Sequence, residues 1–290
     1  MKNVKLISIV ILALAFMAMK GDVEAYRFFN AEGKDVKYKD LVKSASKADI
    51  VFFGEQHNSS IAHWLQLQLT KDLYTKKKDD LILGAEMFET DNQLLMDEYL
   101  SGLIREKNFE DEAKLWKNYT TDYKPLVEIA RGNNLKFIAT NVPRRYASLV
   151  HKEGFEGLEN LSPEAKELIP PLPIEYDPEL KGYKAMLEGM EGMGGHASPN
   201  LPKAQALKDA TMAYNILKNW KSGMTFIHYN GAYHSNDFEG IVWYLKQQKP
   251  NLDILTITTV EQDTISGLKD EYLNLADYIL CVPTDMTKTY

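Results

Sequence analysis

Cysteine is nearly absent from this chain of 290 residues, whose only cysteine is Cys281. A single cysteine cannot form an internal disulfide, and the apolar neighbours of Cys281 in YILCVP favour an inert buried thiol. No cysteine stands near the N-terminus either. Lipid attachment at a cysteine there, through a lipobox, is therefore excluded.

Three catalytic or cofactor motifs are also missing: a Gly-rich phosphate loop, a G-x-S-x-G elbow and a CxxCH sequence. Their absence argues against kinases, serine hydrolases of the elbow type and c-type cytochromes. The chain has no stripe of basic residues, and its net charge is -7 with a pI near 5.5. Nucleic acid is therefore not expected as its partner.

The longest apolar run lies at the N-terminus, from Leu6 to Met19, and follows two lysines. It is short for a membrane span, and the Val-Glu-Ala of residues 23–25 offers a small-x-small cleavage site before Tyr26. We therefore expect residues 1–25 to be a secretory signal peptide and residues 26–290 to be the exported chain. An uncleaved membrane anchor is the alternative.

The segment IVFFGEQH, Ile50 to His57, organises the rest of the chain. Its apolar half predicts a strand buried on both faces, and the following residues predict a helix capped by Asn58 or Ser59. Further apolar runs that alternate with helical patterns occur at residues 81–88, 135–143, 224–231, 252–260 and 276–283. The pattern indicates an α/β fold with a mainly parallel sheet flanked by helices. A Pro/Met/Gly-rich stretch at about residues 155–203 predicts a small helical insert or subdomain.

Polar residues stand at the ends of four predicted strands, and parallel strands end at one edge of a sheet. They are Glu55 with His57, Glu86, Asn141 with Arg144, and His228 with His234. Two histidines and two carboxylates in one crevice could act as a base with an orienting acid, or bind a divalent ion. The alternative to a functional site is that these side chains cap helices and form hydrogen bonds with loop backbone. Since their spacing is not diagnostic of a metal, we assign no metal ligand. His228, inside an apolar strand, is expected to be a hydrogen-bonded core residue, and His63 a satisfied or solvent-facing one.

Five segments together resemble the ChaN-like haem-binding family, within the superfamily that also holds Tiki/TraB proteins and erythromycin esterases. They are GEQH (residues 54–57), AEMFE (85–89), NVPR (141–144), AQALKDATMA (204–213) and NGAYH (230–234). The resemblance implies an exported protein of iron and haem uptake, with haem as cofactor and other envelope uptake components as partners. It also implies that Glu55, His57, Glu86 and His234 match the hydrolase site of the superfamily.

Family haem is expected at a dimer interface with a tyrosine as iron ligand, a chemistry suited to ferric iron. Tyr183, in the insert, is the first choice for the haem contact, with Tyr123 and Tyr176 behind it. His196, after Met-Gly-Gly in the insert, is a further contact, because flexible Met-rich loops suit flat apolar ligands. Ordinary packing is the alternative for Tyr123 and for the methionines.

Two functions of different classes follow. The first is an exported haem-binding protein of iron acquisition, periplasmic or associated with the outer membrane, with haem near the insert and a possible homodimer. The second is a hydrolase that uses the Glu/His site at the sheet edge, with His57 as a base or metal ligand. A structural domain with a vestigial polar edge is a third interpretation.

Overall fold

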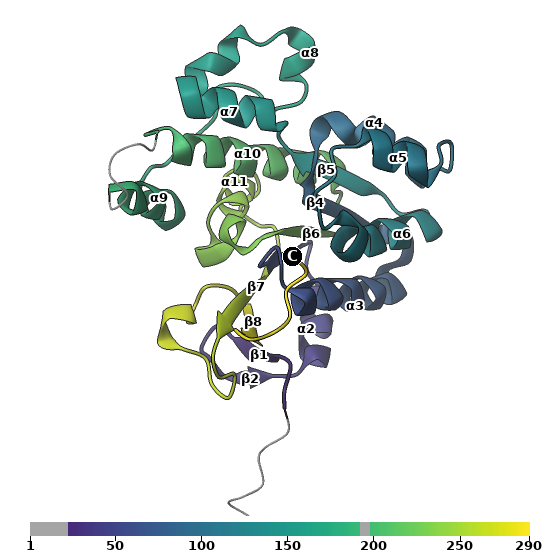
Figure 1. The fold of residues 1–290 in the computed structure, drawn as a ribbon, viewed down its shortest axis with the longest axis vertical. Helices are drawn as coiled ribbons and strands as arrows, with labels where there is room; N and C mark the ends of the chain where they lie inside the picture. Colours follow the sequence, from purple (N-terminus) through teal and green to yellow (C-terminus); the bar gives the residue numbers. More distant parts are fainter. Residues whose placement is uncertain (1–22, 192–197) are drawn as a thin grey trace, which may run out of the picture.

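A twisted eight-stranded sheet runs through the centre of the molecule, in the order β2-β1-β8-β7-β3-β6-β4-β5 (Figure 1). The structure is a computed structural model that describes residues 23–191 and 198–290. The strands are β1 (Arg27–Asn30), β2 (Asp35–Val36), β3 (Ile50–Glu55), β4 (Leu81–Glu89), β5 (Phe137–Asn141), β6 (Thr225–Gly231), β7 (Ile254–Gln262) and β8 (Tyr278–Pro283). Strands β3 to β8 pair with one another in parallel, whereas β1 pairs antiparallel with both β2 and β8. The predicted α/β class and its mainly parallel sheet are confirmed.

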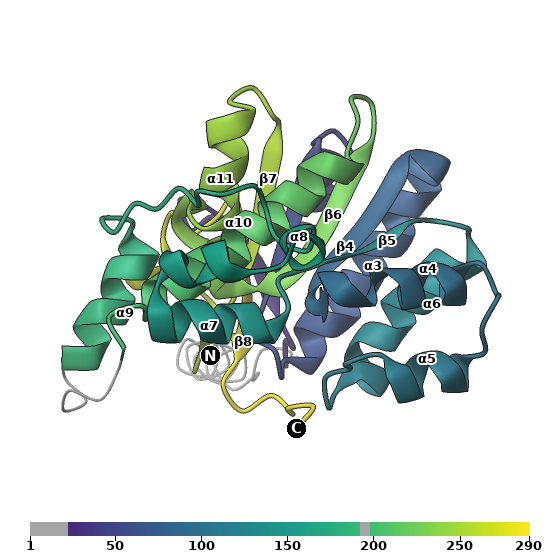
Figure 2. The same ribbon diagram turned by 90° about the horizontal axis from the view of Figure 1, so that it is seen from above.

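Helices cover both faces of the sheet (Figure 2). Their bounds are α2 (Tyr38–Ala45), α3 (Ser60–Lys77), α4 (Gln93–Leu100), α5 (Glu106–Glu112), α6 (Lys124–Gly132), α7 (Arg144–Glu153), α8 (Pro163–Lys166), α9 (Lys181–Glu191), α10 (Leu201–Asn219) and α11 (Ile241–Gln248). Helices α3 and α6 share one apolar cluster with the sheet, while α7, α10 and α11 share another on the opposite face. Two cores thus hold the sheet between two helical layers.

Strand β3 lies at the centre of this arrangement and is buried along its whole length. Its side chains alternate between the two cores: Val51 and Phe53 belong to one, Ile50 and Phe52 to the other. A strand covered by helices on both sides carries apolar residues at every position, which is the pattern that the sequence shows.

The helix after β3 begins as expected. The Ser59 hydroxyl oxygen accepts a hydrogen bond from the Ala62 N–H at 3.3 Å, so Ser59 rather than Asn58 caps α3. The cap holds the short turn of residues 56–58 at the carboxyl edge of the sheet. Strands β4, β5 and β6 end at the same edge, so their terminal residues face the same region.

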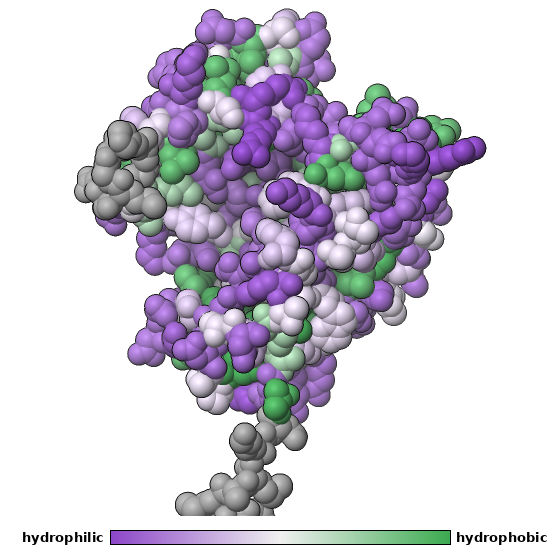
Figure 3. Space-filling model, viewed as in Figure 1, coloured by the Kyte–Doolittle hydropathy of each residue, from purple (hydrophilic) through white to green (hydrophobic). Residues whose placement is uncertain are grey.

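The described residues between β5 and β6, 142–191 and 198–224, form helices and irregular segments, from α7 through the short α8 and α9 to the long α10 (Figure 1). Helices α8 and α9 fall in the stretch where the sequence predicts an insert. Hydrophilic side chains cover most of the face seen in Figure 3. None of the helices in residues 23–191 and 198–290 is both long and apolar enough to cross a membrane. Most of the proposed signal peptide, residues 1–22, lies outside these ranges.

Candidate functional site

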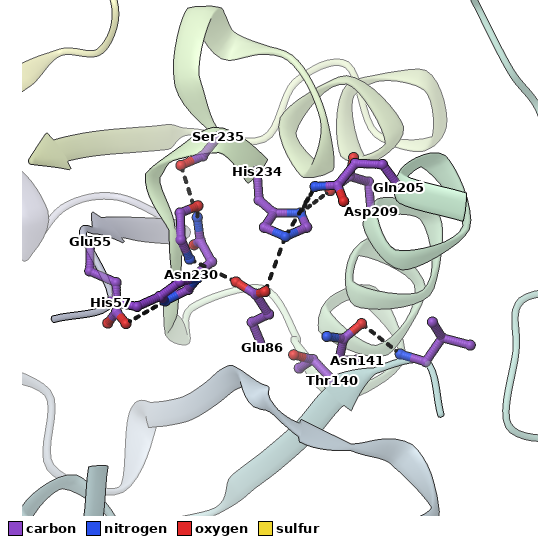
Figure 4. A network of polar contacts seen from close by, with 12 residues as sticks. Glu55, His57, Glu86, Thr140, Asn141, Gln205, Asp209, Asn230, His234 and Ser235 are labelled. Atoms are coloured by element: carbon purple, nitrogen blue, oxygen red, sulfur yellow. Dashed lines mark hydrogen bonds and ion pairs between the residues drawn. The ribbon is translucent and has the colours of Figure 1, made fainter. Parts of the chain in front are cut away.

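Glu55 and His57 form the first half of a polar site at the end of β3. The two side chains lie on the same side of the turn, and the His57 Nδ1 is 3.0 Å from the Glu55 Oε1 (Figure 4). Glu55 is only 2% exposed and accepts two further bonds, from the Gln66 amide at 2.6 Å and the Tyr123 hydroxyl at 2.6 Å. Three donors therefore fix this carboxylate, and the carboxylate in turn orients the His57 ring.

Two side chains of α3, Gln66 and His63, lie behind Glu55. His63 contacts the Gln66 carbonyl through its Nδ1 at 3.1 Å and the His57 carbonyl through its Nε2 at 3.0 Å. Its Nε2 also lies 3.4 Å from the buried carboxylate of Asp122. His63 is thus a buried and satisfied residue, one of the two alternatives that the sequence left open. It positions the groups that hold Glu55.

Glu86, at the end of β4, forms the second half of the site with His234. The His234 Nε2 lies 3.2 Å from the Glu86 Oε1, and its Nδ1 lies 2.5 Å from the Asp209 Oδ1 (Figure 4). The other Glu86 oxygen accepts the Gly231 backbone N–H at 2.7 Å. Asp209 accepts a further hydrogen bond from the Tyr183 hydroxyl at 2.7 Å. Each ring nitrogen of His234 therefore has a carboxylate partner.

The electrostatics of this group favour a fully charged state. Burial alone would lower the pKa of His234, but the negative charges of Glu86 and Asp209 and the hydrogen bonds to both outweigh it and raise the pKa to about 10. Burial alone would raise the pKa of Glu86, yet the His234 imidazolium brings it well below its usual range. Glu86 is therefore an ionised carboxylate, held in place by a protonated histidine.

His57 has a different environment, because a third of its side chain is exposed at 35%. Burial lowers its pKa, while the hydrogen bond to Glu55 and the nearby charge of Glu86 raise it, and the net result is a raised pKa. A Cβ at Gly231 would lie 2.8 Å from the His57 Cε1 and 2.9 Å from its Nε2. Only glycine at this position leaves room for the ring, so the end of β6 fixes the position of His57.

Sequence reasoning missed Asp209, Gln66 and Gly231. Asp209 is 1% exposed on α10, in the segment ALKDATMA, and an acidic residue on the buried face of an otherwise apolar helix is a usable signal. Among the other residues predicted at strand ends, His228 lies in the core and not in the polar site. His228 is fully buried and bonds to Thr140 and Asn230 at 2.8 and 3.1 Å, as expected of a core residue.

A cavity of about 490 Å³ opens beside the two halves of the site. His57 and Glu86 lie at one side of it, and the Trp116 ring packs edge-on against His57 at a centroid distance of 4.9 Å. Helices α7 and α10 form the opposite wall, with Arg144 and Lys208 among its residues. The expected convergence of Glu55, His57, Glu86 and His234 at one sheet edge therefore occurs, next to an open space.

The sequence matches the family described as haem-binding uptake, Tiki superfamily, ChaN, over residues 41–245. This range covers most of the chain and contains the whole polar site. The chain belongs to the ChaN family.

Solved structures agree with this placement at the level of the fold. ChaN of Campylobacter jejuni, whose structure shows cofacial haem binding, has a TM-score of 0.65 and 17% identity over 88% of this chain and 96% of that protein. A mutant of the erythromycin esterase EreC in its open conformation has a TM-score of 0.52 and 11% identity, covering 91% of this chain and 98% of that one. A succinoglycan biosynthesis protein follows with a TM-score of 0.50 and 13% identity, covering 89% and 94%. No protein of curated function matches the sequence.

The residues around the cavity of this ChaN-family protein fit a haem group in chemistry. Haem needs an apolar surface for its ring, cations for its two propionates and a side chain for its iron. Trp116, Val142 and Ala147 supply apolar surface, and Arg144 and Lys208 supply cations. His57 and His151 present imidazoles to the same space.

The tyrosines predicted to contact haem lie elsewhere. Tyr123 and Tyr183 are 1% and 3% exposed, and their hydroxyls donate to Glu55 and Asp209. Burial raises the pKa of both tyrosines far above the ordinary value, which opposes the tyrosinate that ferric iron would need. These placements weigh against both rings as iron ligands, although their assignment stays a prediction. Tyr176 is partly buried and stacks on Tyr183 with ring centroids 5.7 Å apart.

His196 lies outside the described residues, so its predicted haem contact has no structural counterpart. Within the residues that are described, no group of three or more His, Cys, Asp or Glu side chains is arranged to hold a metal ion. The charged groups of the polar site are instead matched to one another: Glu55 to His57, and Glu86 and Asp209 to His234.

Proposed function

We propose that this protein is an exported haem-binding protein of iron acquisition. The observation that carries the proposal is membership of the haem-binding ChaN family over residues 41–245. The cavity at the sheet edge supports it, because apolar, cationic and imidazole side chains face one space of about 490 Å³. We place haem in this cavity, on the side of α7 that leads into the helical insert.

The iron ligand in this proposal is an imidazole of the cavity or one of the predicted insert residues. His57 and His151 reach the space directly, and histidine is a common haem ligand. Tyr176 and His196 remain the insert candidates. We further propose that two copies meet around the ligand and that the apolar run of residues 6–19 directs export, with envelope uptake components receiving the haem.

The test is a titration of the mature chain, from Tyr26 onward, with ferric haem while the visible spectrum is recorded. A saturable change at one haem per chain supports the proposal. A tyrosinate-like high-spin charge-transfer band directs attention to Tyr176, and an imidazole-type spectrum to His57 or His151. The variants Tyr176→Phe, His57→Ala and His151→Ala then identify the ligand, since only one should alter the band shape.

One result would contradict haem binding, and another would contradict a dimer that forms around haem. Only a broad, unsaturable spectrum would show loosely adsorbed haem and would overturn the binding proposal. Dimerisation is tested by sedimentation with and without haem. A mass that does not respond to haem would refute a dimer formed around the ligand.

A second function, hydrolysis, is favoured by one specific observation: His57 is a partly exposed imidazole oriented by a buried carboxylate. This arrangement is that of a general base, whose Nδ1 is engaged and whose Nε2 is left for a water molecule. Glu86 is the fixed negative charge opposite it. His234 has both nitrogens occupied by Glu86 and Asp209, so it acts by holding Glu86 ionised and does not touch a substrate.

The hydrolase proposal has a defined pH signature. A general base must be neutral, so kcat/KM should rise as pH passes the raised pKa of His57, above 6.5. It should fall again as pH approaches about 10, where His234 loses its proton. The assay is hydrolysis of p-nitrophenyl esters by wild type, His57→Ala and the control Lys152→Ala, an exposed residue of α7 that does not line the cavity. Activity that His57→Ala leaves unchanged would rule out this role.

A further inference from the structure

Helix α9 is held on the molecule by polar contacts and by one buried side chain. Among residues 181–189, Tyr183 is the only one that is buried. The apolar side chains of Ala185, Met186 and Leu187 are exposed or half-buried. A cavity of about 270 Å³ lies between the first turn of α9 and the segment after β6. Elements with few buried apolar contacts open locally at a low cost in free energy, so α9 is a weakly held helix.

The polar contacts come from the segment after β6, residues 232–240. Both oxygens of the Glu239 carboxylate accept backbone N–H groups of the first turn of α9, from Lys181 and Gly182, at 2.9 Å each. The Tyr233 hydroxyl donates to the Gly182 carbonyl at 2.8 Å. We call Glu239 and Tyr233 the clamp of α9. A carboxylate at the N-terminus of a helix satisfies its free N–H groups and suits its dipole. The segment that carries the clamp also carries the histidine that binds Glu86.

The buried tyrosine of α9 reaches the polar site through Asp209. The Tyr183 hydroxyl donates to the Asp209 Oδ2 at 2.7 Å, while the His234 Nδ1 lies 2.5 Å from the Oδ1 of the same carboxylate. His234 in turn binds Glu86, which lines the cavity of about 490 Å³ (Figure 4). With a donor on each oxygen, the carboxylate cannot rotate without losing the geometry of at least one hydrogen bond. Tyr183 therefore fixes the plane of the Asp209 carboxylate, and the carboxylate fixes the His234 ring.

We propose that Tyr183 is a positioning residue of the polar site and that α9 is the latch that brings it there. While the clamp holds α9, Tyr183 fixes Asp209 and Asp209 orients His234 toward Glu86. When the clamp opens, the hydroxyl leaves Asp209 and the Glu86–His234 pair loses its support. The latch thus couples the helical insert to the carboxylate at the cavity, since the two positions of α9 differ in contacts at both places. It acts on the unliganded site, so it does not depend on whether the cavity takes haem or a hydrolysable substrate.

The experiment follows α9 and His234 separately by NMR in the mature protein, without any ligand. Amide hydrogen exchange of residues 183–188 reports whether α9 is docked. The ring N–H signals of isotope-labelled histidine, assigned by their loss in His234→Gln, report the hydrogen bonds of His234. The variants are Tyr183→Phe, Glu239→Gln and the double variant, and each keeps the shape of the side chain that it alters. The amides of β3 are the internal reference for an intact fold.

Two matched substitutions are the controls. Tyr176→Phe alters the ring that stacks on Tyr183 at a centroid distance of 5.7 Å, and its hydroxyl is not among the partners of Asp209 in the described part of the chain. Glu188→Gln neutralises an exposed acid of α9 that lies outside the clamp. Both controls should match wild type in the exchange of α9 and in the His234 signal.

We expect both single variants to speed the amide exchange of α9 about 10-fold or more, because each weakens hydrogen bonds to a carboxylate. Both should also shift the His234 ring N–H signal and speed its exchange with water, although Glu239 bonds to α9 and not to Asp209. In the double variant the His234 signal should match that of Tyr183→Phe, because the clamp acts on the site through this one hydroxyl.

Three results would overturn the latch. Faster exchange of α9 in Glu239→Gln with an unchanged His234 signal would show that the clamp only fastens the helix. An effect of Glu239→Gln on His234 that persists beside Tyr183→Phe would show that the change passes along residues 232–240. Unchanged exchange of α9 in both variants would show that neither side chain holds it. Since no haem is present, none of these results bears on haem binding, which the titration tests by itself.

Discussion

Replacing Asp209 by asparagine tests the charged group at the centre of the site. The substitution keeps the shape of the side chain and removes one of the two carboxylates that enclose the His234 ring. Since Asp209 is 1% exposed, its charge is poorly screened by solvent. Removing one partner of a buried ion pair costs several kcal/mol, so we expect Asp209→Asn to lower the free energy of unfolding by about 3 kcal/mol at pH 7.

The pH dependence of the free energy of unfolding tests whether His234 is protonated in the native state. His234 has a folded-state pKa of about 10, above its unfolded value of 6.5, so its contribution is complete below pH 6.5 and is lost as pH rises through 10. Between pH 7 and pH 9 the native state retains the proton that the unfolded state has released. At 1.36 kcal/mol per proton and pH unit, this single residue makes wild type lose about 2.5 kcal/mol over that interval.

In Asp209→Asn the pKa of His234 falls, because only Glu86 still attracts its proton. The variant should therefore lose less stability than wild type between pH 7 and pH 9, and the gap between the two proteins should narrow. The assay is urea denaturation at pH 7, 8 and 9, followed by circular dichroism. Asp285→Asn, the same change at an exposed position, is the control. A gap that stays constant with pH, or one below about 0.5 kcal/mol at pH 7, would refute a protonated His234.

Three further substitutions test other parts of the site and core. Gly231→Ala should displace the His57 ring and lower any esterase activity that depends on it about 100-fold with the fold intact, whereas an unchanged rate would contradict the fixed ring position. Tyr123→Phe removes a donor to the buried Glu55 and should cost about 1–3 kcal/mol in urea denaturation; a neutral effect would show that Gln66 and His57 suffice. Phe52→Ala removes a large side chain from the core beneath α10 and should lower the free energy of unfolding by about 3–5 kcal/mol. A decrease below about 1 kcal/mol would mean that neighbouring side chains fill the space left by the phenyl ring.

The alternation of apolar runs with helical patterns was enough to predict the α/β fold. Strand β3 is buried on both faces because helices cover the sheet on both sides. Its four consecutive apolar residues are the sequence pattern typical of such a strand. The same alternation does not reveal the antiparallel β1–β2 pair. Its strands have four and two residues, too few for a periodic pattern.

The convergence of Glu55, His57, Glu86 and His234 was also predicted, because the direction of parallel strands places their ends together. The partners that give these residues their chemistry were not. Asp209 reaches His234 from a helix 25 positions away in the chain, and Gly231 donates to Glu86 across 145 positions. No local pattern encodes such pairs.

The burial of the tyrosines that were predicted to contact haem could not be foreseen from the sequence either. Tyr123 and Tyr183 looked available in the sequence, yet tertiary packing buries both and commits their hydroxyls to Glu55 and Asp209. The sequence by itself determined the strands of the parallel sheet, a helix cap at Asn58 or Ser59 and the set of polar residues at one edge, since these depend on near neighbours and strand direction. Burial and protonation were decided by the tertiary structure, because both are set by groups that folding brings together from distant parts of the chain.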